Sequence, residues 1–315
     1  MVQFAIEVGT PLESLQKICE KAEELDYKSI FYGDSLNYYA LECWTALTII
    51  SSFTKSIRIG PAVTFSLYRH PAVLARASST LDFFSNGRLD FRMGLGGRGL
   101  KSDSDTYGVP FPNYSERVER LDEALTIIKS LWTNDITNFT GKHFFTHEAP
   151  RKIGHIQQPH PPITVAGQSR GVLNIVAKHA EVWEVGGILP SEYEQRVTIL
   201  NDMCTESGRD VGEISKSLEV TIGISKNGDY VKDALTRNLG KKLSQYERTW
   251  TLLSGGPEEI AHKLNEYIER GVERFTVYYI NYQGNPFDQR SDILIEQMEL
   301  FRDEVIPSLS SRVEP

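Results

Sequence analysis

The strongest constraint on the fold is the alternation of short apolar segments with helix-like segments along nearly the whole chain. Several of the apolar segments are hydrophobic enough to be buried on both faces, which is typical of parallel strands covered by helices. We therefore predict an α/β fold, and a (β/α)8 TIM barrel fits better than an open sheet. The eight predicted strands are 3–8, 29–34, 56–64, 88–96, 161–167, 181–187, 217–225 and 274–280.

An open, doubly wound sheet is the alternative fold, but its usual G-x-G-x-x-G signature is absent after the first strand. A length of 315 residues suits a barrel as one unit. Two insertion segments are expected, a hairpin around Gly141 and a polar, basic stretch at 227–256 that holds a helical piece and is a candidate lid. We therefore predict a single barrel domain over residues 1–315.

Composition limits the classes of partner. A formal net charge of -8 and a pI near 5.5 argue against a nucleic acid or an anionic membrane as the main partner. Cys19, Cys43 and Cys204 are far apart and form no C-x-x-C motif, which indicates buried thiols in a reducing compartment. No signal-peptide pattern and no membrane-spanning apolar run is found, so we expect a cytoplasmic protein with a small-molecule substrate.

The predicted active site lies at the carboxyl ends of the strands, as in other barrels. These ends are apolar and rich in glycine, with no paired carboxylates, no Ser-His-Asp spacing and no metal-ligand cluster. A site with few acids and bases of its own usually takes its chemistry from an organic cofactor. After the fifth strand, the backbone N–H groups of Gly167, Gln168 and Ser169 open a helix and form a natural anion site. Arg170 either closes over this site or lies on the surface.

The segment from Ile59 to Gly97, IGPAVTFSLYRHPAVLARASSTLDFFSNGRLDFRMGLGG, resembles the hallmark block of the luciferase-like family of flavin and deazaflavin oxidoreductases. GVPF…RVERLDEALTIIKSLW, PPITVAGQS and GGPEEIAHKLNEYIERGV follow in the family's order. The resemblance covers roughly residues 1–305 and implies the bacterial luciferase-like TIM barrel. The cofactor would be coenzyme F420, which is a deazaflavin, or FMN. GPAVT followed by Y-R-H-P resembles the deazaflavin branch, which includes methylenetetrahydromethanopterin reductase.

The resemblance implies a non-proline cis peptide at the end of the third strand, which here would be Ala62–Val63. Val63 and Thr64 would then support the middle of the cofactor ring. A strand irregularity caused by Pro61 is the alternative, because proline cannot donate to a sheet ladder.

Asp34, Ser35 and His70 are the catalytic candidates. Asp34 matches the aspartate of an Asp-His pair in the family's deazaflavin enzymes, but Ser35 replaces the histidine, which puts an imidazole base in doubt. Asp34 could equally be a helix N-cap, since aspartate is a preferred cap. His70, before Pro71, either donates a hydrogen bond to a ligand or caps the turn.

The other candidates are expected to contact the cofactor or line the pocket. Arg98 and Arg120 match basic positions that contact the cofactor phosphate in some relatives, although a helix salt bridge with Glu116 or Glu123 is the alternative for Arg120. Aromatic candidates, each of which could also be core, are Trp44, Tyr68, Tyr107, Trp183 and Tyr278. The expected cofactor contacts are Asp34, Ala62, Val63, Thr64, Gly96, Gly97, Arg98, Ala166, Gly167, Gln168, Ser169 and Gly186.

Three functions remain open from the sequence. The first is hydride transfer between coenzyme F420 and a small organic substrate. The second is an FMN-dependent luciferase-like monooxygenase that uses reduced flavin and oxygen. The third is a flavin-binding paralogue without turnover. A homodimer is expected, because relatives pair through the helices after the second and third strands and the segment 41–53 is apolar.

Overall fold

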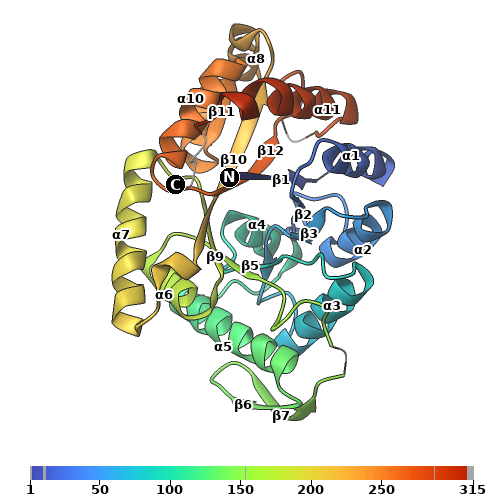
Figure 1. The fold of residues 1–315 in the computed structure, drawn as a ribbon, viewed down its shortest axis with the longest axis vertical. Helices are drawn as coiled ribbons and strands as arrows, with labels where there is room; N and C mark the ends of the chain where they lie inside the picture. The colour runs from blue at the N-terminus through green and yellow to red at the C-terminus, as the bar shows by residue number, and fades with distance from the viewer. Residues whose placement is uncertain (1, 10–11, 153, 287, 311–315) are drawn as a thin grey trace. The chain divides into compact units, whose positions relative to one another are not determined.

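The computed structural model describes residues 2–9, 12–152, 154–286 and 288–310, and only the backbone of residues 12 and 98 (Figure 1). The chain forms two compact units. Unit 1 comprises Met1–Ile30, Glu184–Ile199 and Ser215–Pro315, and unit 2 comprises Phe31–Trp183 and Leu200–Ile214. The boundaries between the units fall inside β2 (Ser29–Tyr32), β9 (Val182–Gly186) and α7 (Pro190–Ser207) and at the start of β10 (Ser215–Ile224). Each unit is therefore described by itself.

Unit 1 is built on parallel strands. β1 (Gln3–Val8) pairs with β12 (Arg274–Tyr279), β12 pairs with β10 (Ser215–Ile224), and β10 pairs with β11 (Leu252–Gly255). The strands are apolar along most of their length and are almost entirely buried, as expected of parallel strands. The helices of this unit are α1 (Leu12–Glu24), the first part of α7 (Pro190–Ser207), α8 (Gly228–Leu239), α9 (Leu243–Thr249), α10 (Pro257–Ile268) and α11 (Ser291–Leu300).

The segment 227–256 is more regular than the sequence indicated. It holds the expected helical structure, as α8 and α9, but its last residues form β11, which extends the parallel sheet beside β10. Placing Leu252–Gly255 in an insert was therefore wrong. Its four residues are too few for a periodic pattern, and the strand is recognised only from its pairing with β10. A lid function for α8 and α9 stays a prediction.

Unit 2 contains the parallel strands β4 (Thr64–Phe65), β5 (Phe91–Gly94) and β8 (Ile163–Ala166), with β3 (Arg58–Pro61) bridged to Leu89. The predicted hairpin around Gly141 is confirmed as β6 (Ile136–Thr140) and β7 (Phe145–Pro150), which lie beside α5 (Figure 1). The helices are α2 (Cys43–Phe53), α3 (Pro71–Phe84), α4 (Arg98–Tyr107), α5 (Tyr114–Thr133) and α6 (Arg170–His179).

Helix α4 occupies a stretch that looked irregular in sequence. Gly, Ser and Asp have low helix propensity, so the sequence RGLKSDSDTY gives only a weak helical pattern. Two of its side chains are fully buried, Leu100 and Asp103, and tertiary contacts of this kind outweigh propensity in short helices. Gly108 ends the helix in the left-handed conformation, at φ 71°.

Among the described residues, no helix is both long enough and apolar enough to cross a membrane.

Candidate active site

The Ala62–Val63 segment that is expected to support the cofactor ring, called the ledge from here on, lies between two short strands of unit 2. β3 ends at Pro61, β4 begins at Thr64, and the Ala62–Val63 peptide between them is cis. The cis bond implied by the resemblance is therefore confirmed. Ala62 and Val63 are only half-buried, whereas Thr64 is fully buried. The ledge thus presents apolar surface from which a flat ring could be supported.

The register of the strands brings several predicted residues together. Thr64 lies beside Met93 in the β4–β5 pair, and Gly94 lies beside Ala166 in the β5–β8 pair. A Cβ atom at Gly94 would be 2.9 Å from Cγ2 of Val63, so a side chain at Gly94 would displace Val63. Glycine at this position therefore lets the ledge pack closely against the end of β5.

Asp34 is buried beside the ledge and bound by two neighbours. Its carboxylate accepts a hydrogen bond from the Thr64 hydroxyl at 2.7 Å and a bidentate pair from Arg69 at 2.6 and 3.0 Å. Burial raises the pKa of Asp34, and the bonds from Arg69 and Thr64 oppose that rise. Asp34 is not a helix cap, so that alternative is wrong: α2 begins at Cys43 and is capped by Glu42.

Asp103 of α4 is a second buried carboxylate, and the sequence analysis missed it. It accepts hydrogen bonds from Ser35 Oγ at 3.1 Å, from the backbone N–H of Leu36 at 3.0 Å and of Asn37 at 2.9 Å, and from the Tyr68 hydroxyl. The Ser35 hydroxyl therefore donates a hydrogen bond to a buried carboxylate. The only sequence signal was an aspartate in a polar stretch, which by itself indicates a solvated loop.

His70 lies at the start of a helix and contacts an aromatic ring. It is the N-cap of α3, where its Nδ1 accepts a hydrogen bond from the backbone N–H of Ala72 at 3.2 Å. Its ring contacts Phe144 edge-on, with the ring centroids 5.4 Å apart. Of the two roles considered for His70, the capping role is confirmed.

The predicted anion site is the loop Gly167–Ser169, which joins β8 to α6 and is called the phosphate loop from here on. Gly167 has φ 136°, a conformation that favours glycine, and its carbonyl accepts a hydrogen bond from Trp183 Nε1 at 2.8 Å. Ser169 precedes α6, and its hydroxyl lies 2.7 Å from the hydroxyl of Tyr114. The side chain of Ser169 makes no capping bond to the helix, so the hydroxyl pair of Ser169 and Tyr114 lies at a helix N-terminus, where an anion is favoured.

Arg117 is a basic residue that the sequence analysis missed. One of its terminal nitrogens donates to the Gly96 carbonyl, and its guanidinium lies 4.2 Å from the centroid of the Phe111 ring. Its Nε is buried and has no hydrogen-bond partner. A Cβ atom at the neighbouring Gly97 would meet nothing within 4 Å, so there is open space beside this loop.

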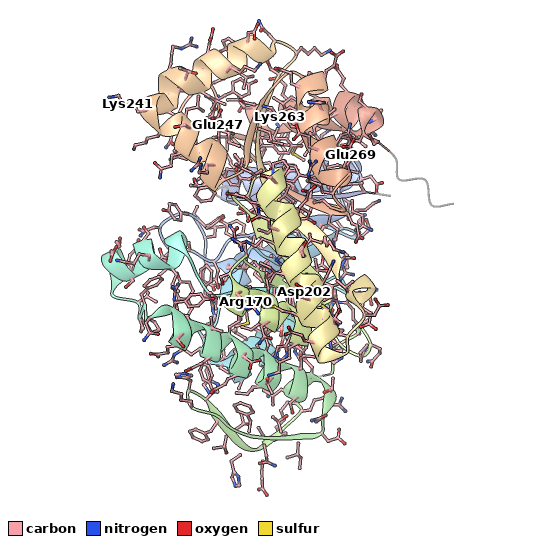
Figure 2. All side chains as sticks on the ribbon, turned by 90° about the vertical axis from the view of Figure 1, so that its left-hand side faces the viewer. Arg170, Asp202, Lys241, Glu247, Lys263 and Glu269 are labelled. Carbon is pink, nitrogen blue, oxygen red and sulfur yellow. The ribbon has the colours of Figure 1, made fainter. Side chains whose placement is uncertain are left out.

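The other basic candidates differ in their surroundings. Arg120 donates to Glu116 at 2.8 Å one helical turn away, so the salt-bridge alternative is confirmed. Arg170 is exposed at the start of α6 (Figure 2). Arg98 begins α4, but its side chain lies outside what the structure describes.

The remaining candidates are distributed over both units. Trp44 is buried and packs near Phe91, with the ring centroids 6.3 Å apart, whereas Tyr107 is exposed. Tyr278, in β12, and Gly186, at the end of β9, belong to unit 1.

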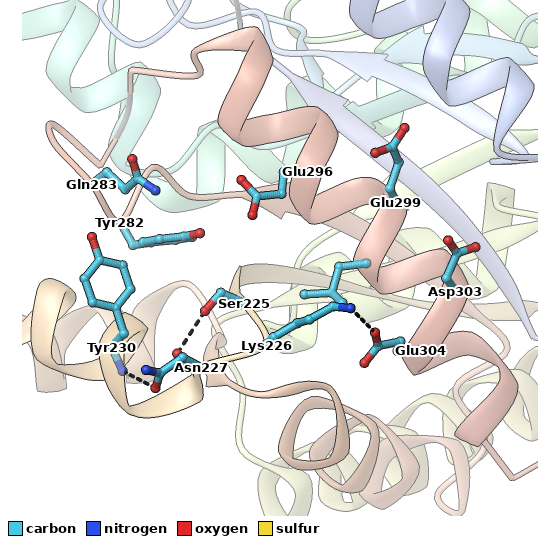
Figure 3. A pocket seen from close by; sticks show the side chains of 11 residues that line it. Ser225, Lys226, Asn227, Tyr230, Tyr282, Gln283, Glu296, Glu299, Asp303 and Glu304 are labelled. Atoms are coloured by element: carbon cyan, nitrogen blue, oxygen red, sulfur yellow. Dashed lines mark hydrogen bonds and ion pairs between the residues drawn. The ribbon is translucent and has the colours of Figure 1, made fainter.

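Unit 2 has a pocket of about 520 Å³ next to the Asp34 and Asp103 clusters. It is lined by Ser66, Leu67, Tyr68, Arg69, His70, Pro110, Phe111, Pro112, Glu116, Arg120 and Phe144. Unit 1 has another pocket of about 480 Å³, where Tyr282 lies near Glu296 and Lys226 forms an ion pair with Glu304 (Figure 3). None of the predicted site residues lines this second pocket.

Solved structures with the same fold cover nearly the whole chain. The coenzyme F420 dependent tetrahydromethanopterin reductase from Methanopyrus kandleri is 21% identical, with a TM-score of 0.79 over 98% of this chain and 99% of that one. An F420-dependent secondary alcohol dehydrogenase is 15% identical, with a TM-score of 0.82 over 98% of this chain and 99% of that one. The chain therefore has the TIM-barrel fold that the sequence predicted.

Curated relatives are more similar in sequence but align over less of their length. The F420-dependent hydroxymycolic acid dehydrogenase of Mycobacterium tuberculosis is 30% identical over 52% of this chain and 46% of the relative. A phthiodiolone/phenolphthiodiolone dimycocerosates ketoreductase of Mycobacterium bovis is 28% identical over 62% of this chain and 50% of the relative. The chain thus matches about half the length of these relatives.

The family profile for luciferase-like monooxygenases matches residues 2–250, which is most of the chain. The match includes the ledge, both carboxylate clusters and the phosphate loop. The protein therefore belongs to the luciferase-like monooxygenase family.

Proposed function

We propose that this protein transfers a hydride between coenzyme F420 and a small organic substrate, of the secondary alcohol or ketone class. The relatives in the Mycobacterium species support this choice, since one is named an F420-dependent dehydrogenase and the other a ketoreductase. The observation that supports it most directly is the position of the buried Asp34 next to the ledge, because Asp34 matches the aspartate of the deazaflavin branch.

The ledge and its neighbours would hold and orient the cofactor ring. Val63 and Thr64 would cover one face of the ring, and the close packing of Gly94 on Val63 keeps the ledge fixed. The bidentate bond from Arg69 holds Asp34 in one orientation. When bound, the deazaflavin supplies the hydride acceptor or donor, and the protein supplies orientation.

The phosphate group of the cofactor would lie at the N-terminus of α6. Ser169, Tyr114 and the backbone N–H groups of the loop offer donors there, and the helix dipole favours an anion. Arg117 would add a positive charge, and its unpartnered Nε supports this role because a buried donor without an acceptor is costly.

The FMN-dependent monooxygenase is the second candidate. The long-chain alkane monooxygenase LadA has the same fold, with a TM-score of 0.77 over 99% of this chain. Ser35, where the deazaflavin branch has a histidine, is the observation in its favour.

A parallel activity assay tests the proposal. The purified protein is incubated without oxygen with oxidised F420 and a panel of secondary alcohols, and the loss of deazaflavin absorbance is followed. Reduced F420 with the matching ketones tests the reverse direction, and reduced FMN with oxygen tests the alternative. We expect turnover only with F420. Oxygen-dependent turnover with FMN would contradict the proposal, and tight cofactor binding without any turnover would favour the non-catalytic paralogue.

A further inference from the structure

An alcohol that loses a hydride must also lose its hydroxyl proton, and Ser35 cannot act as the imidazole base of the deazaflavin branch. We propose that Tyr68 and Asp103 form the acid–base pair of this enzyme. In this pair, Tyr68 exchanges a proton with the substrate oxygen while Asp103 exchanges a proton with Tyr68. The proposal rests on the proposed function and concerns the same site.

The contact between the two side chains has the direction that such a relay needs. The Tyr68 hydroxyl donates its hydrogen bond to Oδ2 of Asp103. A phenol oxygen that donates in this way still has lone pairs for accepting a hydrogen bond from a second hydroxyl group. Tyr68 is half-buried and lines the 520 Å³ pocket of unit 2, which has room for a small molecule beside this side chain.

Asp103 would exchange a proton with the substrate only through Tyr68, because its own carboxylate is buried. Its exposed fraction is 0%, so Tyr68 is the residue that links its carboxylate to the pocket. Bonds from Ser35 Oγ and from the N–H groups of Leu36 and Asn37 fix both oxygens in place. Asp103 is thus held in a fixed position in which its Oδ2 faces the Tyr68 hydroxyl.

The pair lies next to the residues expected at the cofactor. Ser35, bound to Asp103, follows Asp34 in the chain, and Asp34 is bonded to Thr64 of the ledge. Tyr68 precedes Arg69, which donates hydrogen bonds to both carboxylate oxygens of Asp34. A Cβ atom at Gly99 would lie 3.3 Å from the Ser35 Cβ, so the start of α4 also packs on this loop. The hydrogen bonds of Asp34 and Asp103 thus join the loop after β2 to the loop after β4.

The proton and electron balance is complete. In oxidation, the substrate C–H bond breaks and the hydride passes to the oxidised deazaflavin. The substrate O–H bond breaks as its proton moves to Tyr68 Oη, and the proton of Tyr68 moves to Asp103, so a C=O bond forms. Ketone reduction follows the same path in reverse. Burial and the Asp103 charge both raise the pKa of Tyr68, so the phenol remains protonated between turnovers.

Tyr68→Phe tests the proposal, because it removes one oxygen and keeps the ring. We expect kcat to fall about 100-fold or more, as for loss of an acid–base group, with the Kd of F420 changed by less than about threefold. Fluorescence quenching of F420 measures that Kd without turnover. Tyr38→Phe, an exposed tyrosine of the same unit, is the control and should retain full kcat.

Asp103→Asn gives a second measurement that a purely structural role would not produce. It should lower kcat, and ultraviolet titration of the cofactor-free protein should show the Tyr68 phenol ionising at lower pH once the adjacent charge is gone. If Asp103→Asn does not fold, Tyr68→Phe alone decides. A Tyr68→Phe enzyme with kcat within threefold of wild type would overturn the pair and leave the proposed function intact. A wild-type protein that neither binds nor turns over F420 would instead overturn the proposed function.

Discussion

At the scale of single residues, the site depends on how buried carboxylates are paired. Asp34 is 5% exposed and receives three hydrogen bonds from Thr64 and Arg69. Arg69 also bonds to Glu42, which caps α2, so one guanidinium joins the end of β2 to the next helix. A charge that is buried this deeply is stable in the fold only because it is paired.

Arg69→Met should destabilise the fold, because it leaves the Asp34 carboxylate buried without a charged partner. We expect the free energy of unfolding at pH 7 to fall by about 3 kcal/mol in a denaturant titration. Arg120→Met is the matched control. Its ion pair with Glu116 lies on a helix surface, so its loss should cost about 0.5 kcal/mol. Equal losses in the two variants would contradict this account.

The stability lost in Arg69→Met should depend on pH in a defined direction. Burial raises the pKa of Asp34 in the folded protein, and loss of Arg69 removes the main opposing interaction. When folding raises the pKa of a carboxyl, the folded protein loses stability as the pH rises from the pKa of the unfolded state, about 4, to the pKa of the folded state. The Tm difference between Arg69→Met and wild type should therefore be smaller at pH 4 than at pH 7.

The residue-scale contacts were only partly accessible from sequence. The cis Ala62–Val63 peptide is implied by the resemblance to the luciferase-like family, the role of His70 as a cap is one of two that local sequence allows, and both are confirmed. Arg69, Asp103 and Arg117 were missed because their partners are distant in sequence; Asp103, for example, binds Ser35. A single polar residue gives no local signal of such a partner.

At the scale of elements, the close contact between β3 and the segment before β5 positions the ledge. The Ile59 carbonyl accepts from the Asp90 N–H at 2.8 Å, and Arg58 bonds to the Asp90 side chain at 2.6 Å. Gly60 lies so close to this segment that a Cβ atom would be 2.1 Å from the Asp90 carbonyl oxygen. The backbone itself would have to move to make room.

Gly60→Ala should therefore destabilise the fold more than the addition of one methyl group usually does. We expect a loss of about 1–3 kcal/mol of unfolding free energy from overpacking, measured by chemical denaturation. Gly154→Ala is the control, since a Cβ there would meet nothing within 4 Å. Its effect should stay within about 0.5 kcal/mol. A Gly60→Ala protein as stable as this control would show that β3 can shift freely.

The elements themselves were largely predictable. Long helices such as α5 and buried strands such as β10 have a clear periodic pattern, and both appear where expected. β11 was missed because it has four residues, and α4 because its composition disfavours helix. Both are stabilised by neighbours that lie elsewhere in the chain.

At the scale of the whole molecule, the self-association predicted from the family can be tested on α3. This helix exposes Val73, Phe83 and Phe84, with exposed fractions of 56%, 54% and 74%. Apolar side chains that gather on one helix often mark an interface. α3 is also the helix after the third predicted strand, one of the two helices through which the family resemblance implies pairing.

Replacing both Phe83 and Phe84 with Ser should convert a dimer into a monomer. Light scattering after size-exclusion chromatography measures the mass of each form. Phe145→Ser, at a 73% exposed position on β7, is the control and should leave the dimer intact. A wild-type monomer, or a double variant that stays dimeric, would rule out this surface.

The central claim is that a deazaflavin ring lies against the Ala62–Val63 ledge, and binding of the cofactor tests it most directly. Fluorescence titrations with F420 and with FMN compare the wild type with Gly94→Val, in which the new side chain must displace Val63. We predict saturable F420 binding at least about tenfold tighter than FMN binding, a difference of about 1.4 kcal/mol, and marked weakening in Gly94→Val. Tighter binding of FMN, or F420 binding unchanged by Gly94→Val in a folded protein, would contradict the account.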